Sequence, residues 1–312
     1  MKQLIEECLR RVCTVKFPNN GEPSHINRPT TGRFNDSLFF TLNGREMIFR
    51  MAPPEDQGFL FYERNMMAQE PEIHRIVREE TDVPVAEILI YDDSRLIAPR
   101  PYLIMDRLPG VPLPEARHAS KSAVYRQIGE HLRAVHEITA DKYGYLGAHK
   151  PMEAAANWPD AFEIMWNKLL DDVVDCGGYS VQQSDRFRRL LDRERGMFER
   201  DIESSLLHMD IWAENILVDE EGNVSGIVDW DRALWGDPEI EFAVLDYCGV
   251  LVPAFWQGYG APKEASPRAQ RRAIYYYLYE MQKYIVIERR RRGNPAFADR
   301  YGSEALLIAS QM

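Results

Sequence analysis

The sequence has few cysteines, no long apolar run and no signal-peptide pattern, and each of these absences argues against a class of protein. It contains no CxxC or other paired cysteine spacing among Cys8, Cys13, Cys176 and Cys248. A disulfide framework or a cysteine-bound zinc site is therefore not expected, and a reducing cytoplasm is the simplest compartment. No stretch of about 18 apolar residues occurs, so no membrane-spanning helix is expected. The charged start, MKQLIEECLRR, lacks the apolar core of a signal peptide.

The chain also has fewer basic than acidic residues. Lys and Arg number 38 against 49 Asp and Glu, which gives a formal net charge of −11. Nucleic-acid binding needs a basic surface, so we expect no nucleic-acid partner. The run Arg289 to Arg292 follows an apolar segment of helical period, and it is more typical of a helix C-terminus than of a nucleic-acid patch. The acidic excess suits either a cationic partner or simple solubility.

The first third of the chain predicts a small antiparallel sheet. Leu38–Leu42 and Glu46–Met51 are expected to form strands, joined by an Asn-Gly pair that is typical of a tight hairpin turn. Tyr62 to Glu79 has the pattern of a helix, in which Pro71 either causes a kink or marks the start of a second part. Two further short strands are expected in VPVAEILIYDD and PYLIMDRLPG.

The character of the sequence changes after Pro109-Gly110, where we place a hinge between two lobes. A helical period begins at Ser122, and residues 157–200 predict more helix with a break at Gly177-Gly178. We therefore predict an α+β fold with a small N-terminal lobe, residues 1–107, that holds the sheet and one helix. Residues 108–312 are expected to form a larger, mainly helical lobe.

The stretch from Leu206 to Ala243, LLHMDIWAENILVDEEGNVSGIVDWDRALWGDPEIEFA, carries the chemistry. Asp210 and Asn215 lie five residues apart, and Asp229 ends the next apolar run. Two short strands, over residues 215–218 and 224–228, would return Asp229 to the loop that holds the other two. A base, an amide and a carboxylate in this order are typical of phosphoryl transfer.

The residue types define roles for this chemistry. Asp210 is placed to orient the acceptor hydroxyl or to accept its proton, and Asn215 and Asp229 offer the hard oxygen ligands that Mg²⁺ prefers. His208 is too close to Asp210 to be a second base, so we interpret it as a structural residue. Asp231 is either a second carboxylate near the metal or a residue that stabilises a turn.

HMDIWAENIL and IVDWDRALWGDPEIEFA resemble the aminoglycoside phosphotransferase family, the small-molecule branch of the protein-kinase-like fold. That group also includes choline, fructosamine, macrolide and homoserine kinases. The resemblance extends from about Arg28 to Tyr284. It implies a two-lobed kinase-like fold that uses ATP, or GTP, together with Mg²⁺. It also implies that Asp210 is the catalytic residue and that Asn215 and Asp229 are the metal ligands.

The resemblance in the N-terminal half concerns the nucleotide. TTGRFNDSLFF is similar to the nucleotide loop of the family in a single-glycine form, with Gly32, Asn35 and Ser37 in place of a GxGxxG motif. The family places a Lys or Arg that reaches the phosphates in the next strand, and Arg50 occupies that position here. Arginine stays charged and can hold phosphates, although with a geometry different from that of lysine.

Two more nucleotide-site features follow from the resemblance. Glu70 matches the helix glutamate that pairs with the strand cation, and Glu63 is a rival because Pro71 makes the helix register uncertain. Met105 to Leu108 matches the hinge that reads the adenine edge, mostly through the backbone groups of Asp106 and Leu108.

The resemblance implies a small-molecule alcohol as phosphate acceptor, bound against residues 155–200 and 268–290. These stretches are rich in acidic and aromatic residues, which would suit a cationic acceptor, although each is individually typical of a solvated helix face or of packing. The first candidate is an aminoglycoside-like antibiotic, and hence a role in antibiotic resistance. The alternatives are a metabolic kinase of the choline, amino-sugar, fructosamine or macrolide type, and a catalytically silent kinase-like protein. The oligomeric state stays open.

Overall fold

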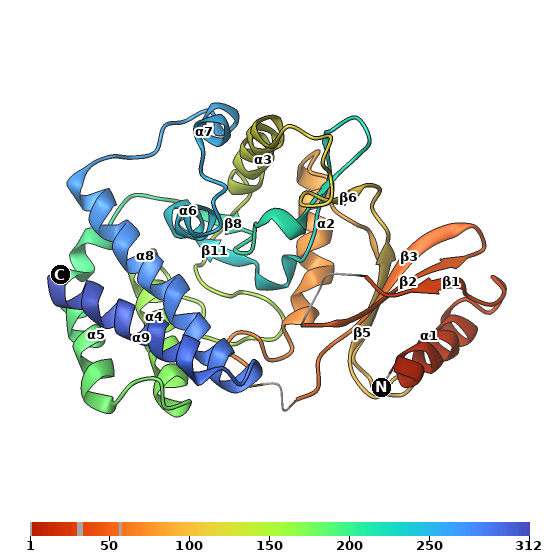
Figure 1. Ribbon diagram of the computed structural model, residues 1–312, viewed down its shortest axis with the longest axis horizontal. Helices are drawn as coiled ribbons and strands as arrows, with labels where there is room; N and C mark the ends of the chain where they lie inside the picture. Colours follow the sequence, from red (N-terminus) through yellow and green to blue (C-terminus); the bar gives the residue numbers. More distant parts are fainter. Residues whose placement is uncertain (1, 30–33, 56–57) are drawn as a thin grey trace.

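The N-terminal lobe is built on a five-stranded antiparallel sheet in the computed structural model, which describes residues 2–29, 34–55 and 58–312 (Figure 1). The strands lie in the order β1-β2-β3-β5-β4. Their bounds are β1 Ser24–Asn27, β2 Asp36–Leu42, β3 Arg45–Met51, β4 Ile88–Asp92 and β5 Tyr102–Asp106. Asn43 and Gly44, both at positive φ, turn the chain between β2 and β3, which confirms the predicted hairpin. The edge strand β1 was not predicted.

Two helices accompany this sheet. α1 (Lys2–Lys16) packs its apolar face on the sheet, where Ile5 and Leu9 share a core with Phe40 of β2. α2 (Glu70–Glu80) starts later than predicted, because residues 66–69 form a 3-10 turn instead of α-helix. Proline fits the first turn of a helix, where an N–H has no intrahelical acceptor, so Pro71 marks the start of α2 instead of kinking it.

The C-terminal lobe is mainly helical, as predicted. Its helices are α3 Lys121–His136, α4 Trp158–Asp175, α5 Val181–Glu194, α6 Pro238–Tyr247, α7 Pro253–Tyr259, α8 Pro267–Val286 and α9 Pro295–Gln311. Figure 1 shows α4, α5, α8 and α9 gathered at the end of the molecule away from α1, and α3 packs against α7. Gly177, at positive φ, separates α4 from α5 at the predicted break. Among the described residues, none of the helices is both long and apolar enough to span a membrane.

Two small three-stranded sheets lie within this lobe and frame the predicted catalytic stretch. One has the order β10-β9-β6 and the other β11-β8-β7. Their strands are β6 Val111–Pro112, β7 Thr139–Ala140, β8 Ser204–Leu207, β9 Ile216–Val218, β10 Val224–Ile227 and β11 Leu234–Gly236. The β9-β10 hairpin confirms the predicted pair of strands, with Ile216 opposite Ile227. It returns the chain to the point where β8 ended.

The basic run Arg289 to Arg292 follows α8, as expected. Its guanidinium groups also form ion pairs with other segments. Residues 287–291 form one π-helical turn, and arginines of the run Arg289 to Arg292 pair with separate carboxylates. Arg289 pairs with Asp299, Arg291 with Glu63, and Arg292 with Glu288. The run therefore ties the end of α8 to α9 and to the segment that precedes α2.

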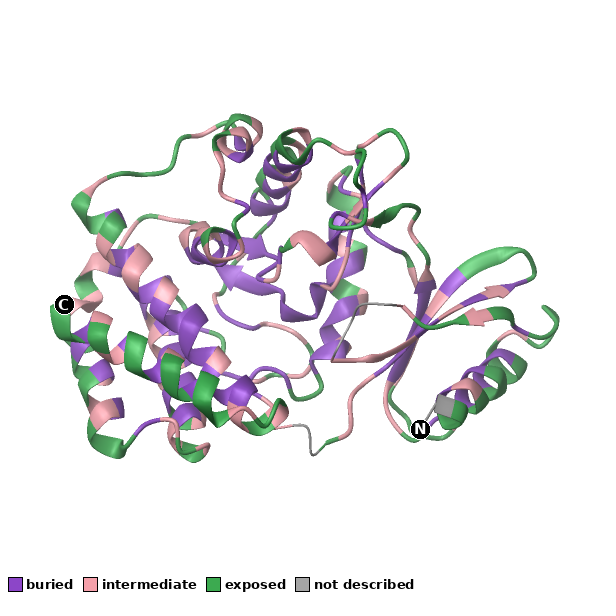
Figure 2. Cartoon of the chain, in the orientation of Figure 1, coloured by how far each residue is buried: buried purple, intermediate pink, exposed green. Residues whose placement is uncertain are grey.

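Helix α2 stands between the two lobes (Figure 2) and packs into the core of the larger one. Its Ile73 and Val77 share a buried cluster with Val124 of α3, Ile216 of β9 and Trp230. The two-lobed α+β fold is thus confirmed, but α2 buries its apolar face with the C-terminal lobe. The chain boundary between residues 107 and 108 stays a prediction.

Candidate active site

The loop after β8 is organised around a buried histidine. The Nε2 atom of His208 lies 3.1 Å from the carbonyl oxygen of Val228, and its Nδ1 atom accepts the Asp210 N–H at 3.2 Å. Because Nδ1 accepts, the proton resides on Nε2 and is donated to Val228. Burial lowers the pKa of His208, which favours this neutral form. These bonds join the loop to the end of β10 and fit the predicted structural role.

Asp210, Asn215 and Asp229 are brought together by this loop and the hairpin. The Asn215 Nδ2 donates to the backbone oxygen of Asp210 at 2.9 Å and to its Oδ2 at 3.3 Å. The Val228 N–H donates to the carbonyl oxygen of Asn215 at 3.0 Å, which sets the start of β9 beside Asp229. The bonds use the nitrogen of the Asn215 amide, so its side-chain oxygen is left for another partner.

Arg232 is a site residue that sequence reasoning missed. Its Nη1 donates to Asp210 Oδ1 at 2.6 Å, and the guanidinium is buried. Burial raises the pKa of Asp210, but Arg232 and Lys283 lower it by more, and the net shift is downward. Asp210 is therefore held as a carboxylate. The available signal was that Arg232 is a rare base within a strongly acidic stretch.

Arg50 on β3 connects the two lobes. Its Nη1 lies 2.7 Å from Glu70 Oε2, and its Nη2 lies 2.7 Å from Asp229 Oδ1 and 3.4 Å from Asp231 Oδ2. Burial lowers the pKa of Arg50, but the three carboxylates outweigh it and the net shift is upward. Of the two glutamates left open by the sequence, Glu70 contacts Arg50. Glu63 instead pairs with Arg291.

Asp231 is buried within the same group of charges. Burial raises its pKa well above the ordinary value, and the nearby Asp229 and Glu70 carboxylates add to the shift. Its Oδ2 accepts the Asn35 Nδ2 at 3.3 Å. Asn35 therefore reaches the site from the predicted nucleotide loop. Ser37 lies directly opposite Arg50 in the β2-β3 register.

The remaining predicted nucleotide residues are placed as follows. Gly32 lies outside the described residues. Asp106 ends β5, with its carboxylate oxygens 2.6 and 2.7 Å from Arg45 nitrogens and its N–H donated to the Glu87 carbonyl at 3.0 Å. That N–H is thus already used in this structure. Leu108 packs its side chain beside Gly226 of β10.

A buried glutamate on α6 supports the loop that holds Asp210. Glu241 Oε1 accepts the N–H of Met209 at 2.6 Å, and Oε2 lies 2.7 Å from His136 Nε2. Met209 has φ of 65°, a left-handed conformation that costs energy for a residue with a side chain. Glu241 therefore holds a strained residue next to Asp210. Its position in GDPEIEFA did not reveal this contact.

We expect Glu241→Gln to lower the free energy of unfolding by roughly 3 kcal/mol, because one partner of a buried charged contact is lost. Urea unfolding followed by circular dichroism measures the change. Glu137→Gln is the matched control, since Glu137 forms an exposed pair with Arg133 at 2.8 Å. Such a pair contributes less than about 1 kcal/mol. Equal losses in the two variants would contradict the supporting role of Glu241.

Because of the buried His74 on α2, we expect the free energy of unfolding of the protein to depend on pH. Its Nδ1 lies 2.8 Å from the Ala86 carbonyl, and burial lowers its pKa from 6.5 to about 4. The unfolded chain takes up the proton first as the pH falls. The stabilisation of the folded state by neutral His74 is thus complete above pH 6.5 and is lost between pH 6.5 and about 4. The loss amounts to about 3 kcal/mol when complete.

Denaturant unfolding of the wild type and of His74→Gln at several pH values tests this expectation. The difference between the two proteins should shrink as the pH falls through this window. His118→Gln serves as the control because His118 is exposed. A difference that does not vary with pH would show that His74 is not the titrating group.

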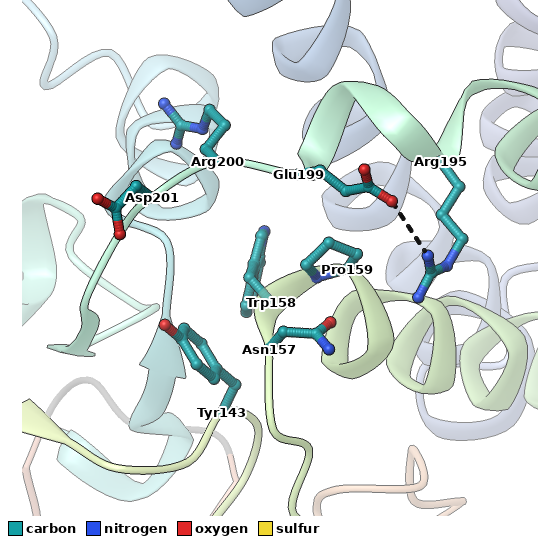
Figure 3. Close-up of a pocket in the computed structure, with 8 residues that line it drawn as sticks. All are labelled: Tyr143, Asn157, Trp158, Pro159, Arg195, Glu199, Arg200 and Asp201. Carbon is teal, nitrogen blue, oxygen red and sulfur yellow. Dashed lines mark ion pairs between the residues drawn. The ribbon is translucent and has the colours of Figure 1, made fainter.

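A cavity of about 450 Å³ lies elsewhere in the C-terminal lobe (Figure 3). Its lining contains none of the predicted site residues and consists of Tyr143, Asn157, Trp158, Pro159, Arg195, Glu199, Arg200 and Asp201. Figure 3 shows the Arg195 and Glu199 side chains facing each other, with nitrogen and oxygen 3.7 Å apart.

The fold and this site define a kinase-like phosphotransferase. The sequence profile of the phosphotransferase enzyme family matches residues 25–274, so the chain belongs to that family. The chain is therefore an enzyme, a small-molecule kinase, which confirms the class predicted from Asp210, Asn215 and Asp229.

Among individual relatives, a protein named probable ketoamine kinase from Vibrio parahaemolyticus is 26% identical over 68% of this chain and 71% of its own length. The viomycin phosphotransferase of Streptomyces vinaceus is 28% identical over 46% of this chain and 49% of its own. A solved aminoglycoside phosphotransferase, APH(4)-Ia in complex with AMP-PNP and hygromycin B, superposes with a TM-score of 0.68. That match covers 96% of this chain and 99% of the other at 18% identity, and it confirms the kinase-like fold.

Proposed function

We propose that this enzyme transfers the γ-phosphoryl group of ATP, with GTP as the alternative donor, to a hydroxyl group of a small molecule. The observation that carries the proposal is the convergence of Asp210, Asn215 and Asp229 with Arg50, which bonds to Asp229 at 2.7 Å. ATP as donor is supported by the related fold that binds AMP-PNP. The predicted set of Asp210, Asn215 and Asp229 is complete and lies together, which speaks against the catalytically silent alternative.

Asn215 and Asp229 are the residues proposed to hold Mg²⁺. The Asn215 amide keeps its oxygen available, and the Asp229 side chain is 37% exposed with one oxygen bonded to Arg50. A neutral and an anionic oxygen fit a cation that takes the rest of its shell from water and phosphates. When bound, Mg²⁺ neutralises charge on the phosphates.

The side chains of this enzyme have separate tasks in the proposed reaction. Arg50 is proposed to hold the phosphates, with Glu70 fixing its position from α2. Asn35 and Ser37 come from the segment that would cover the nucleotide, as would Gly32, and the hinge at Asp106 and Leu108 would face the base. Asp210 orients the acceptor hydroxyl and takes its proton as the new O–P bond forms.

An aminoglycoside-like antibiotic is the first candidate acceptor, supported by the hygromycin B complex and the viomycin phosphotransferase among similar proteins. A ketoamine is the second, favoured by the two Vibrio proteins named probable ketoamine kinase among similar proteins. Three of the acidic residues of α4 are already paired within the chain. Asp160 and Glu163 contact Arg195, and Asp171 contacts Arg188.

A coupled assay of ADP release tests the proposal across aminoglycosides, macrolides, choline-like alcohols and glycated amines. We expect Mg²⁺-dependent ADP release that one acceptor class stimulates. The same assay with Asp210→Asn gives the background. ADP release at that background for every acceptor, with ATP and with GTP, would overturn phosphoryl transfer to a small molecule and would favour a nucleotide-binding role.

A further inference from the structure

Gln69 is a buried glutamine at the end of the 3-10 turn Met66–Gln69, directly before α2. Only 2% of its surface is exposed. Its Nε2 donates to the backbone oxygen of Asp231 at 2.5 Å and to that of Ala233 at 3.3 Å. These two oxygens lie on either side of Arg232 along the chain. One side-chain amide therefore binds the backbone both before and after Arg232.

The direction of the Arg232 side chain matters because its guanidinium contacts the proposed catalytic residue. Its Nη1 donates to Asp210 Oδ1 at 2.6 Å, and its Nη2 lies 3.6 Å from Glu280 Oε2. Arg232 ends the 3-10 turn Trp230–Arg232, which the Ala233 N–H closes by donating to the Trp230 oxygen at 3.1 Å. Hydrogen bonds of 3-10 turns have poorer geometry than those of α-helices. The two bonds from Gln69 therefore add to the support of this turn.

The next residue, Glu70, makes the corresponding contact on the nucleotide side. Its Oε2 lies 2.7 Å from Nη1 of Arg50, the residue proposed to hold the phosphates. Two adjacent residues at the start of α2 thus contact the two halves of the site, Glu70 through Arg50 and Gln69 through the turn that carries Arg232. The apolar face of α2 is buried in the core of the C-terminal lobe, so both contacts start from one fixed element.

Gly147 leaves the space that Gln69 fills. A Cβ atom at position 147 would lie 2.5 Å from both Cβ and Oε1 of Gln69, and 2.8 Å from Nδ1 of His149. Contacts this short are not tolerated, so a side chain at this position would displace the glutamine. Glycine allows the backbone of this segment to approach closely. Gly147 therefore keeps the amide of Gln69 where it can bind the turn.

We propose that Gln69 is a positioning residue that fixes Arg232 and, through it, holds Asp210 in line with the acceptor hydroxyl. This inference rests on the proposed function. A displacement of about 1 Å within an active site can lower turnover by about 100-fold, so loss of the amide acts on kcat. It leaves the affinity for the nucleotide in place, because Arg50 and Glu70 keep their own contact.

Gln69→Met, which keeps the length of the side chain but removes its donor, tests the proposal. We expect kcat to fall by about tenfold to a hundredfold, while the affinity for AMP-PNP in calorimetry stays within about threefold. Gln282→Met is the matched control and should keep the wild-type kcat. Gln282 is also buried, but its amide donates within α8 to the Leu278 oxygen at 3.1 Å. Gly147→Ala should lower kcat in the same direction with the Gln69 amide still present.

A double-mutant cycle separates positioning of Arg232 from general support of the fold. In an Arg232→Met background, Gln69→Met should change kcat by less than about twofold, because its effect passes through Arg232. An equal fall of kcat in both backgrounds would overturn the proposal, and so would a wild-type kcat in Gln69→Met alone. A loss of AMP-PNP affinity as large as the loss of kcat would assign the amide to the support of Asp229 instead.

Hydrogen exchange distinguishes failure of this inference from failure of the proposed function. If the wild type phosphorylates no acceptor, the proposed function fails, and backbone exchange then decides whether Gln69 holds the turn. We expect the amides of residues 230–236 to exchange about fivefold to tenfold faster in Gln69→Met, as for a lost hydrogen bond, with those of residues 38–51 unchanged. That increase supports the inference, and wild-type exchange in residues 230–236 refutes it.

Discussion

Replacing Asp210 with asparagine is expected to lower kcat by about 1000-fold, the effect of losing a positioned proton acceptor. Asparagine keeps an oxygen for Arg232, whose Nη1 lies 2.6 Å from Asp210 Oδ1, so the loop geometry should persist. The affinity for AMP-PNP should stay within about threefold, because the proposed roles of Asp210 concern the acceptor alone. Single-turnover phosphoryl transfer and calorimetric binding of the analogue measure the two effects.

Asp246→Asn is the matched control for this variant. Asp246 lies on α6, and its carboxylate is 64% exposed. It should therefore keep the wild-type kcat. A kcat for Asp210→Asn within tenfold of the wild type would show that Asp210 only orients the hydroxyl. A loss of analogue binding would instead point to a disturbed fold.

The second large effect is expected for Asp229→Asn. We expect kcat/KM to fall by roughly 1000-fold, since a metal that stabilises charge on the phosphates is held less well. Asparagine is preferred to alanine here because Asp229 has φ of 71°, and asparagine tolerates that left-handed conformation. The affinity for ADP should drop in the presence of Mg²⁺ and change little in its absence. Calorimetric titrations with and without the metal measure this difference.

Arg50 complicates this variant, because its Nη2 bonds to Asp229 at 2.7 Å in the described structure. An uncharged partner could loosen Arg50 and weaken nucleotide binding without any metal. That outcome would appear as an equal loss of ADP affinity in both titrations. It would contradict the metal-binding role of Asp229 and assign the residue to the Arg50 network.

The sequence was informative where local pattern decides structure. The Asn-Gly turn, the β9-β10 hairpin and the helical period of α3 all follow from residues that are neighbours along the chain. The proximity of Asp210, Asn215 and Asp229 follows from the same logic, since one hairpin separates them. The role of Pro71 stayed open at the level of sequence because a proline inside a helical pattern is compatible with both a kink and a helix start.

Contacts between segments that are distant in the sequence could not be predicted from the sequence pattern. Arg232 lies in the 3-10 turn Trp230–Arg232, Lys283 on α8 and Glu241 on α6. The residues next to each of them in the sequence do not indicate that the three meet around Asp210. The acidic stretch of α4 shows the same limit. Its Asp160 and Asp171 pair with Arg195 and Arg188, which come from later in the chain. Periodicity shows which side of a helix is polar, but it does not show which charged residue from another segment will pair with that side.

Helix α2 follows the first strands of the N-terminal lobe in the sequence but packs with the C-terminal lobe. Its apolar face shares the core of the C-terminal lobe, and Gln69, just before it, donates to the backbone oxygens of Asp231 and Ala233 at 2.5 and 3.3 Å. A rotation of the five-stranded sheet would therefore slide β3 past its own helix and stretch the Arg50–Glu70 ion pair. A change in the angle between the sheet and α2 would therefore change the distance between Arg50 and Glu70, which is 2.7 Å in this structure.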